Sequence, residues 1–313
     1  MSKKILVTGA GGFIGRHVAR ELMELGHEVL CLDRAFEEGD YWMRNQYFLD
    51  ISNYEKLRST IKEDVDIIFH LAAQSTGSIS MEDPEKDIDW NAKGTLNICR
   101  LAREKNVETI IYTSTMAVYG NGSWKKETDK LNPLSNYGVS KLTGEFYVKS
   151  LQQYGINHTI YRLWNTYGPG QNMENPRNGI VSCYLQQALE GKEINVTGSF
   201  DRFRDLVYID DTVSAILTGL QPAADNDVFN ICNKREVSVQ EMIDGILETH
   251  DLDALEFNVT NVGGHDGDQS GSSGDNEKLI GIGWKPKTTY GEGIKKFYNY
   301  EKQKRKNNRR NTN

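Results

Sequence analysis

The chain has 313 residues, of which 38% are hydrophobic and 26% are charged, a balance typical of globular proteins with one large or two closely joined domains. The net charge of −7 argues against a general nucleic-acid binder, and no apolar run approaches the roughly 18 residues of a membrane span. The N-terminus, MSKKILVTGA, lacks a signal-peptide pattern, so we expect a cytoplasmic protein without membrane insertion.

The four cysteines are far apart in the sequence and fall in apolar settings: Cys31, Cys99, Cys183 and Cys232. None stands at metal-ligand spacing from another cysteine or a histidine, so no metal site is expected. We interpret them as buried thiols of a reducing compartment.

Strand-like and helix-like stretches alternate from the N-terminus. Short apolar runs predict strands at residues 5–8, 28–33, 47–49, 66–71 and 109–113. Apolar residues at helical spacing predict helices at residues 14–25, 54–61 and 88–103. This alternation is typical of an α/β fold in which helices cover both faces of a parallel sheet.

After about residue 165 the pattern becomes less regular, with helices expected at residues 179–190, 211–220 and 239–249. Residues 263–276, GGHDGDQSGSSGDN, predict a loop that is either disordered or a binding lid. The expected division is a first domain of residues 1–170, a smaller one of residues 171–300 with some segments returning to the sheet, and a basic flexible tail of residues 301–313.

A glycine-rich turn, VTGAGGFIG, joins the first expected strand to the first expected helix. Its glycines, Gly9, Gly12 and Gly15, suit a tight turn that brings the backbone close to a pyrophosphate at a helix N-terminus. Asp33 ends the second strand, where a carboxylate can accept hydrogen bonds from the adenosine ribose hydroxyls. The same carboxylate would repel a 2′-phosphate, so the sequence predicts NAD rather than NADP.

A second motif, NYGVSK, places Tyr137 and Lys141 four residues apart, on one face of a helix. A tyrosine with a pKa near 10 is a poor base, but a neighbouring ammonium and the positive nicotinamide ring stabilise its phenolate. Lowering that pKa to about 7 requires roughly 4 kcal/mol. Tyr137 could then remove the proton of a sugar hydroxyl while hydride leaves the carbon.

Together these motifs resemble the extended short-chain dehydrogenase/reductases, the family of nucleotide-sugar epimerases and dehydratases. Further matches follow in the family's order: Asp50-Ile51, HLAA at 70–73, Asn91, TSTMAVYG at 113–120, RLWNTYGPGQ at 162–171 and RFRDLVYIDD at 202–211. The resemblance covers nearly the whole chain. It implies a Rossmann-type doubly wound parallel sheet with a smaller, mixed α/β C-terminal substrate domain.

The resemblance also implies the site residues. The catalytic set is Thr115, Tyr137 and Lys141. The NAD site takes Gly9, Gly12, Phe13, Ile14, Gly15, Asp33, Arg34, Asp50, Ile51, Leu71, Ala72, Ala73, Asn91, Tyr137, Lys141 and Leu163. The nucleotide-sugar site takes Gln74, Thr115, Asn165, Arg204, His265 and Ser272, with Asn165 and Arg204 on the diphosphate.

Several reactions occur within this resemblance, and all begin by oxidising a sugar carbon to a ketone. The 4,6-dehydratases need a carboxylic acid directly after the catalytic threonine, and the decarboxylases tend to have one, whereas Thr115 is followed by Met116 and Ala117. We therefore favour a 4-epimerase of UDP-hexoses or UDP-N-acetylhexosamines. A nucleotide-sugar 4-reductase, another keto-sugar-forming oxidoreductase and a non-catalytic dinucleotide-binding protein stay open as alternatives.

Two positions bear on the substrate. His265 stands where many UDP-sugar epimerases have an arginine, with Arg202 as a possible substitute cation, and the small Ser272 leaves room for an N-acetyl group. By resemblance the protein is a homodimer in surface polysaccharide synthesis. Residues 88–103 and 137–154 would pair with their copies, using in part Val139, Leu142, Phe146 and Leu151.

Overall fold

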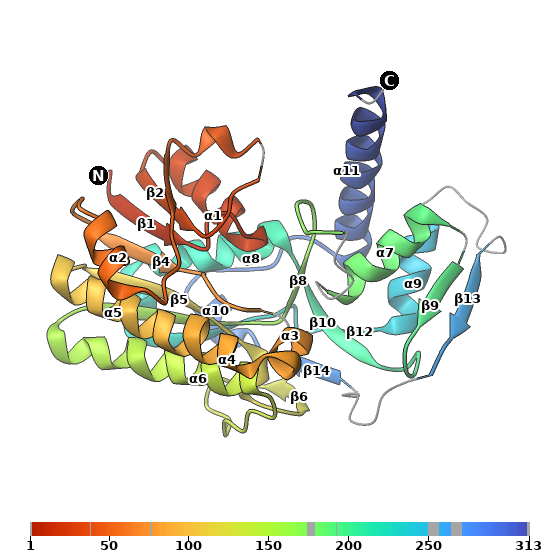
Figure 1. The fold of residues 1–313 in the computed structure, drawn as a ribbon. Helices are drawn as coiled ribbons and strands as arrows, with labels where there is room; N and C mark the ends of the chain where they lie inside the picture. Colours follow the sequence, from red (N-terminus) through yellow and green to blue (C-terminus); the bar gives the residue numbers. More distant parts are fainter. Residues whose placement is uncertain are drawn as a thin grey trace.

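The structure is a computed structural model that describes residues 2–37, 39–75, 77–173, 179–191, 193–249, 257–263 and 271–311. Within these residues two halves, each built around its own sheet, lie side by side (Figure 1). A long C-terminal helix, α11 (Tyr290–Asn311), projects from the molecule.

The first half contains, in the described residues, a sheet of seven strands in the order β11-β7-β5-β4-β1-β2-β3. All of its neighbouring strands are parallel. The strands are β1 (Lys4–Thr8), β2 (Glu28–Asp33), β3 (Asn45–Phe48), β4 (Ile67–His70), β5 (Thr109–Thr115), β7 (Asn157–Leu163) and β11 (Asp227–Ile231). This is the Rossmann-type parallel sheet that the sequence predicts.

Helices cover both faces of this sheet. One face carries α1 (Phe13–Glu24) and α8 (Ile209–Leu217), and the other carries α2 (Tyr54–Thr60), α5 (Gly94–Lys105) and α6 (Asn136–Lys149) (Figure 1). Along β1 the side chains alternate, so that Ile5 and Val7 belong to one core cluster and Leu6 to the other. Because both faces are buried, these strands are continuously apolar in sequence.

The helix expected at residues 88–103 begins with a wider turn. Residues Asp87–Lys93 are π-helical, and α5 follows directly. The turn places Asp87 and Asn91 together in the interior, where Asn91 Nδ2 donates to Asp87 Oδ1 at 3.2 Å. Such turns often mark functional sites, and periodicity alone does not predict them.

The second half contains a sheet in the order β12-β10-β14-β6, with β8 beside β10. Its strands are β6 (Gly122–Lys125), β8 (Asn165–Tyr167), β10 (Phe203–Tyr208), β12 (Glu236–Ser238) and β14 (Gly271–Gly274). A separate pair is formed by β9 (Glu193–Val196) and β13 (Asn258–Asn261). The helices expected at 179–190 and 239–249 are α7 (Ile180–Glu190) and α9 (Val239–Glu248).

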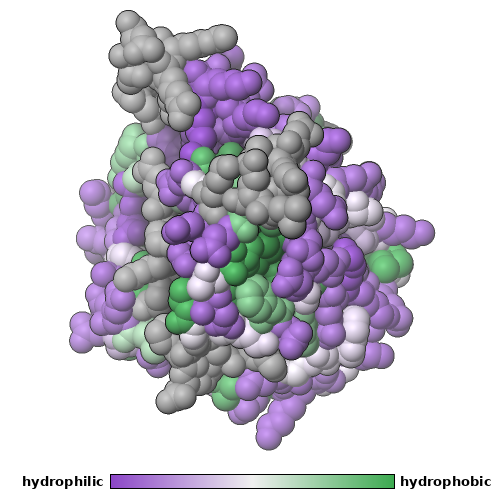
Figure 2. Space-filling view, turned by 90° about the vertical axis from the view of Figure 1, so that its right-hand side faces the viewer, coloured by the Kyte–Doolittle hydropathy of each residue, from purple (hydrophilic) through white to green (hydrophobic). Residues whose placement is uncertain are grey.

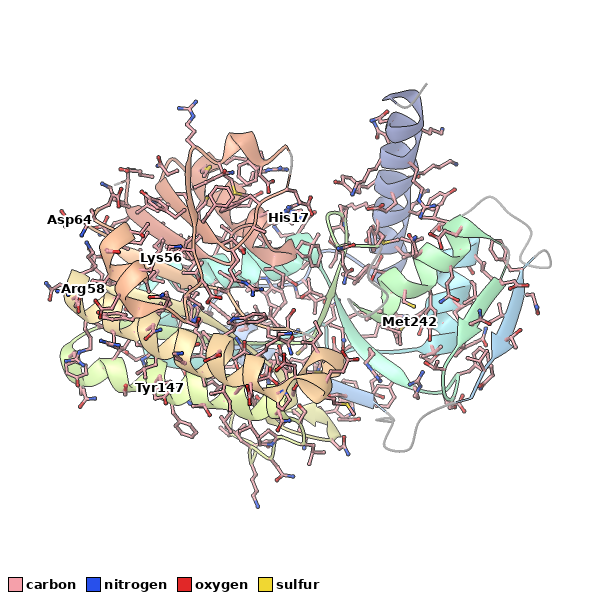
Figure 3. The ribbon with its side chains drawn as sticks, viewed as in Figure 1. His17, Lys56, Arg58, Asp64, Tyr147 and Met242 are labelled. Atoms are coloured by element: carbon pink, nitrogen blue, oxygen red, sulfur yellow. The ribbon has the colours of Figure 1, made fainter. Side chains whose placement is uncertain are left out.

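The remaining helices are short. They are α3 (Gly77–Glu82), α4 (Pro84–Lys86), α10 (Glu277–Gly281) and the 3₁₀ turns Asp40–Trp42, Met116–Val118, Ser150–Tyr154, Thr218–Leu220 and Pro222–Ala224. His17 on α1 lies on the side that faces the second half (Figure 3), with Nε2 3.0 Å from the carbonyl oxygen of Pro169. Seen from its own side, the second half is largely hydrophilic, with one group of hydrophobic residues near its centre (Figure 2).

The loop prediction for residues 263–276 is wrong for its second part, because Gly271–Gly274 form the buried strand β14. A Cβ atom at Gly271 would lie 2.5 Å from the ring of Phe203, and one at Gly274 would lie 2.7 Å from Cys232 Sγ. These glycines therefore allow close packing inside a sheet, where the composition suggested a turn. Residues 264–270 lie outside the described part.

Several other expectations differ from the structure. Residues 301–311, expected as a flexible tail, continue α11, and Arg305 Nη2 donates to Gln186 Oε1 at 2.7 Å. Leu151 is buried and thus not available to a partner, whereas Leu142 is partly buried and Val139 and Phe146 are 51% and 62% exposed.

The four thiols are free, and Cys183 is half-buried while the other three are buried. Among the described helices none combines the length and the apolar character that crossing a membrane requires. The described residues also include no cluster of His, Cys, Asp or Glu suited to a metal ion.

Candidate active site

The glycine-rich turn forms one wall of a cavity of about 480 Å³ at the carboxyl ends of the sheet strands. Gly9 has a φ of +75°, and a Cβ atom there would lie 2.6 Å from the backbone nitrogen of Ala72. At Gly15 a Cβ atom would lie 1.9 Å from the carbonyl oxygen of Gly9. Helix α1 starts after Gly12 without a side-chain cap, so its first N–H groups are available to an anion.

Most of the residues expected to bind NAD line this cavity: Gly9, Gly12, Phe13, Ile14, Gly15, Asp33, Arg34, Asp50, Ile51, Leu71, Ala72 and Ala73. Asn91, Tyr137, Lys141 and Leu163 do not line it. The lining also includes residues that the sequence did not single out, which are Gly11, Leu32, Ala35, Phe36, Glu37, Leu49, Ser75, Trp90 and Thr113. A largely apolar cavity beside a glycine-rich helix start fits a dinucleotide.

Asp33 and Trp90 line the cavity from two different elements. Asp33 Oδ2 accepts a hydrogen bond from the backbone N–H of Gly11 at 3.0 Å, which fixes the carboxylate beside the turn. The guanidinium of Arg34 lies 3.7 Å from the ring centroid of Trp90. The sequence signal for Trp90 was its place next to Asn91, but only the fold brings it opposite Arg34.

The start of α6 brings the three expected catalytic residues together. Ser135 caps the helix by accepting a hydrogen bond from the N–H of Gly138 at 3.1 Å. A Cβ atom at Gly138 would lie 2.8 Å from the carbonyl oxygen of Ala117, so glycine allows α6 to approach the end of β5. At that strand end Thr115 lies close enough to the side chain of Tyr137 to lower its pKa, and Lys141 follows one turn further along the helix.

Burial disfavours the charged forms of both Tyr137 and Lys141. It raises the pKa of Tyr137 to about 12, against a lowering contribution from Thr115, and the carboxylate of Asp87 raises it as well. Burial lowers the pKa of Lys141 to about 7, against a raising contribution from Glu145. The protein by itself therefore opposes the phenolate that we expected, because burial disfavours the charged form of Tyr137.

Asn91 and Gln74 belong to a buried polar network beside these residues. Asn91 Oδ1 accepts from the N–H of Gln74 at 2.7 Å, and Asn91 Nδ2 donates to the carbonyl oxygen of Gln74 at 3.1 Å. Asn91 Nδ2 also donates to Ser140 Oγ at 3.0 Å. This network fixes the loop after β4 against the catalytic helix, and a direct contact of Asn91 with the cofactor stays a prediction.

The second sheet brings together three of the residues expected on the substrate. Arg204 of β10 is in register with Ser272 of β14, and Asn165 of β8 pairs with Leu206, two residues further along β10. Asn165 Oδ1 and Ser272 Oγ are buried without a hydrogen-bond partner among the described residues. Buried polar atoms of this kind are rare and indicate positions where a ligand can bind.

Arg202 and His265 were the two further cations expected near the diphosphate, and the structure describes only Arg202. Arg202 Nε donates to the carbonyl oxygen of Ser199 at 3.3 Å, and Arg202 also donates to the carbonyl oxygen of Thr197. Its guanidinium is thus engaged with its own loop. His265 lies outside the described residues.

Comparison with known proteins agrees with this geometry. Residues 5–232 match the model of the NAD dependent epimerase/dehydratase family. A Methanocaldococcus jannaschii protein provisionally named a UDP-glucose 4-epimerase is 32% identical, over 95% of this chain and 98% of the relative. The dTDP-D-glucose 4,6-dehydratase of Homo sapiens is 31% identical, over 94% and 89% of the two chains.

Among solved structures, the UDP-glucose 4-epimerase of Thermotoga maritima with UDP-glucose superposes with a TM-score of 0.90. It is 30% identical, and the match covers 96% of this chain and 99% of that chain. The relatives thus share the fold and differ in the reaction named for them.

Proposed function

Because the chain belongs to the NAD dependent epimerase/dehydratase family, we propose that it is a UDP-sugar 4-epimerase that acts through a transient 4-keto sugar. NAD is the family's cofactor, and the cradle of Gly9, Gly12 and Gly15 with Asp33 fits it. When bound, NAD would take up hydride from the sugar carbon and return it, and its positive ring would favour the Tyr137 phenolate.

The observation that carries this proposal is the strand end after Thr115. Met116 packs against the core and Ala117 lies next to Gly138, so this turn presents neither a carboxylic acid nor a carboxylate to the sugar. A dehydratase needs such a pair to remove a proton at C5 and release the C6 hydroxyl. Oxidation followed by return of the hydride to the other face needs only one acid/base at the reacting oxygen.

The residues of the site have distinct parts in this reaction. Thr115 lies close to the side chain of Tyr137, and both would reach the reacting sugar oxygen. Tyr137 would take the hydroxyl proton during oxidation and return it during reduction, with Lys141 as the ammonium that stabilises the phenolate. Arg204 and Asn165 would hold the diphosphate, which leaves the sugar free to turn over.

Ser272 supports acceptance of N-acetylated sugars. It lies in register with Arg204, and its buried hydroxyl has no partner among the described residues. A small polar side chain at this wall would accommodate an acetamido group and could bond to it. We therefore include UDP-N-acetylhexosamines among the substrates.

A homodimer is also part of the proposal. Val139 and Phe146 on α6 are more than half exposed, and Leu96 on α5 is 38% exposed. Apolar side chains gathered on two neighbouring helices are a candidate interface. Sedimentation velocity of the wild type and of Phe146→Asp checks this, and a monomeric wild type contradicts it.

Proton NMR of the purified protein with UDP-N-acetylglucosamine, and separately with UDP-glucose, tests the reaction. A 4-epimerase interconverts the gluco and galacto anomeric signals with catalytic NAD and no net change in NADH absorbance. Growth of a methyl doublet from a 6-deoxy-4-keto sugar would instead identify a dehydratase. Stoichiometric consumption of NADH would identify a reductase.

A further inference from the structure

A carboxylate that the proposed reaction does not use is buried one turn beyond Lys141 on α6. The side chain of Glu145 is 0% exposed. Its Oε1 accepts hydrogen bonds from Ser114 Oγ at 2.6 Å and from Arg162 Nε at 2.9 Å, and its Oε2 accepts from Arg162 Nη2 at 2.8 Å. The bidentate pair and the serine leave the carboxylate with a single defined position.

These contacts connect the elements that carry the catalytic residues. Ser114 precedes Thr115 on β5, and Glu145 follows Lys141 by one helical turn on α6. The carboxylate of Glu145 is thus a direct side-chain link between the strand that presents Thr115 and the helix that presents Tyr137. A displacement of this link would change the distance between Thr115 and Tyr137.

The same network continues to the second half. Arg162 Nη1 donates to the hydroxyl of Tyr119 at 2.8 Å, and that hydroxyl donates to Asn230 Oδ1 at 2.7 Å. Asn230 Nδ2 then donates to the carbonyl oxygen of Asp275, directly after β14, at 3.2 Å. A chain of buried hydrogen bonds therefore runs from the catalytic helix to the strand that carries Ser272.

The titratable groups around Lys141 lie on three elements. Tyr137 and Glu145 lie on α6 itself, and Lys141 Nζ lies 4.3 Å from the ring centroid of Tyr112 on β5. His70 on β4 is neutral, because burial and the Lys141 ammonium lower its pKa to about 3.

Of these groups Glu145 is the one that raises the pKa of Lys141, against the lowering effect of burial. Arg162, on β7, is bound to Glu145 and stands one step further along the network. A carboxylate held in one position can therefore offset part of the desolvation of the ammonium.

We propose that Glu145 is a positioning residue of the active site, which favours the ammonium form of Lys141 and holds Thr115 at its distance from Tyr137. A buried ion pair is weak evidence for a contribution to stability, because desolvation of both charges offsets their attraction. Because Glu145 lies between the segments that carry Thr115 and Tyr137, we infer that its ion pair with Arg162 positions these residues rather than stabilising the fold. The expected effect of Glu145 on turnover rests on the proposed epimerase reaction. Its expected effect on the charge of Lys141 does not depend on that reaction.

The charge is measured by ¹³C NMR of the protein labelled at the lysine ε-carbon, with Lys141→Met used only to assign the resonance. Glu145→Gln keeps the shape and the hydrogen-bonding capacity but removes the charge, and we expect the midpoint of Lys141 to fall by about one pH unit. Glu145→Asp keeps the charge and should restore the midpoint. The alkaline limb of kcat/KM should move to lower pH in Glu145→Gln and return in Glu145→Asp.

An unchanged Lys141 midpoint in folded Glu145→Gln would overturn the inference, as would equal pH profiles of the Gln and Asp variants. Should Glu145→Gln not fold, the double variant Glu145→Gln with Arg162→Met removes both buried charges, and the midpoint should fall by less than one pH unit, because the loss of the more distant Arg162 cation offsets part of the effect. A lowered midpoint in a protein that epimerises no UDP-sugar would reject the proposed function and keep the inference about Lys141. Epimerisation of a UDP-sugar with an unchanged Lys141 midpoint in Glu145→Gln would support the proposed function and reject the inference about Lys141.

Discussion

The two halves of this enzyme build their binding surfaces in different ways. The cofactor cavity takes its residues from short segments at the ends of neighbouring parallel strands, such as Gly9 to Gly15 and Asp33 to Glu37. The proposed substrate side joins Asn165, Arg204 and Ser272, which come from three strands far apart in the chain. The first surface is therefore encoded locally, whereas the second depends on long-range strand pairing.

The largest expected effect lies at Tyr137, which we propose as the catalytic acid and base. Tyr137→Phe removes the hydroxyl that we propose as acid and base, so turnover should fall by about 10²- to 10⁴-fold while bound NAD stays near the wild-type amount. Turnover is followed by NMR, and NAD is quantified after release from denatured protein. Turnover within tenfold of the wild type would remove Tyr137 from the mechanism.

The local encoding of the cofactor half can be broken at one glycine. Gly15→Ala places a Cβ atom 1.9 Å from the carbonyl oxygen of Gly9, so the turn must distort and NAD affinity should fall roughly 10- to 100-fold. Isothermal titration with NAD measures the change. The matched control is Gly291→Ala, where a Cβ atom meets nothing within 4 Å and the affinity should be that of the wild type.

The long-range encoding of the substrate half can be tested in β14. Gly274→Ala places a Cβ atom 2.7 Å from Cys232 Sγ, so the free energy of unfolding should fall by about 1–3 kcal/mol in urea denaturation. The KM for the nucleotide sugar should rise and NAD affinity should not change. An equal loss of NAD affinity would show that the two surfaces are not separately encoded.

The smallest expected effect concerns Trp90, one of the residues that the fold adds to the cofactor cavity. Trp90→Leu removes the stacking partner of Arg34, a contact of about 0.5–1 kcal/mol at a partly exposed site, so NAD should bind about two- to fivefold more weakly. Trp42→Leu is the control, since Trp42 stacks with Arg20 outside the cavity. Equal affinities of the two variants would exclude Trp90 from the cofactor site.

The contrast between local motifs and long-range strand pairing also explains which features could be predicted from the sequence. The strand and helix order, the glycine turn and the helix of Tyr137 and Lys141 follow from patterns within a few residues of each other. The strand Gly271–Gly274 did not follow, because its glycines have a turn-like composition and only Phe203, Trp164 and Cys232 make them necessary. The burial that opposes the phenolate also depends on packing between distant segments, which no short motif records.

One strand of the main sheet has a consequence for how the protein unfolds. β11 (Asp227–Ile231) pairs with β7 at the edge of the cofactor sheet, although the chain reaches it only after passing through the second half. Residues 1–170 expressed alone would lack this strand and leave the edge of β7 unpaired, a template for aggregation. The chain thus passes through the second half before it completes the sheet of the first half. We therefore expect the cofactor and substrate surfaces to unfold together in a single cooperative transition.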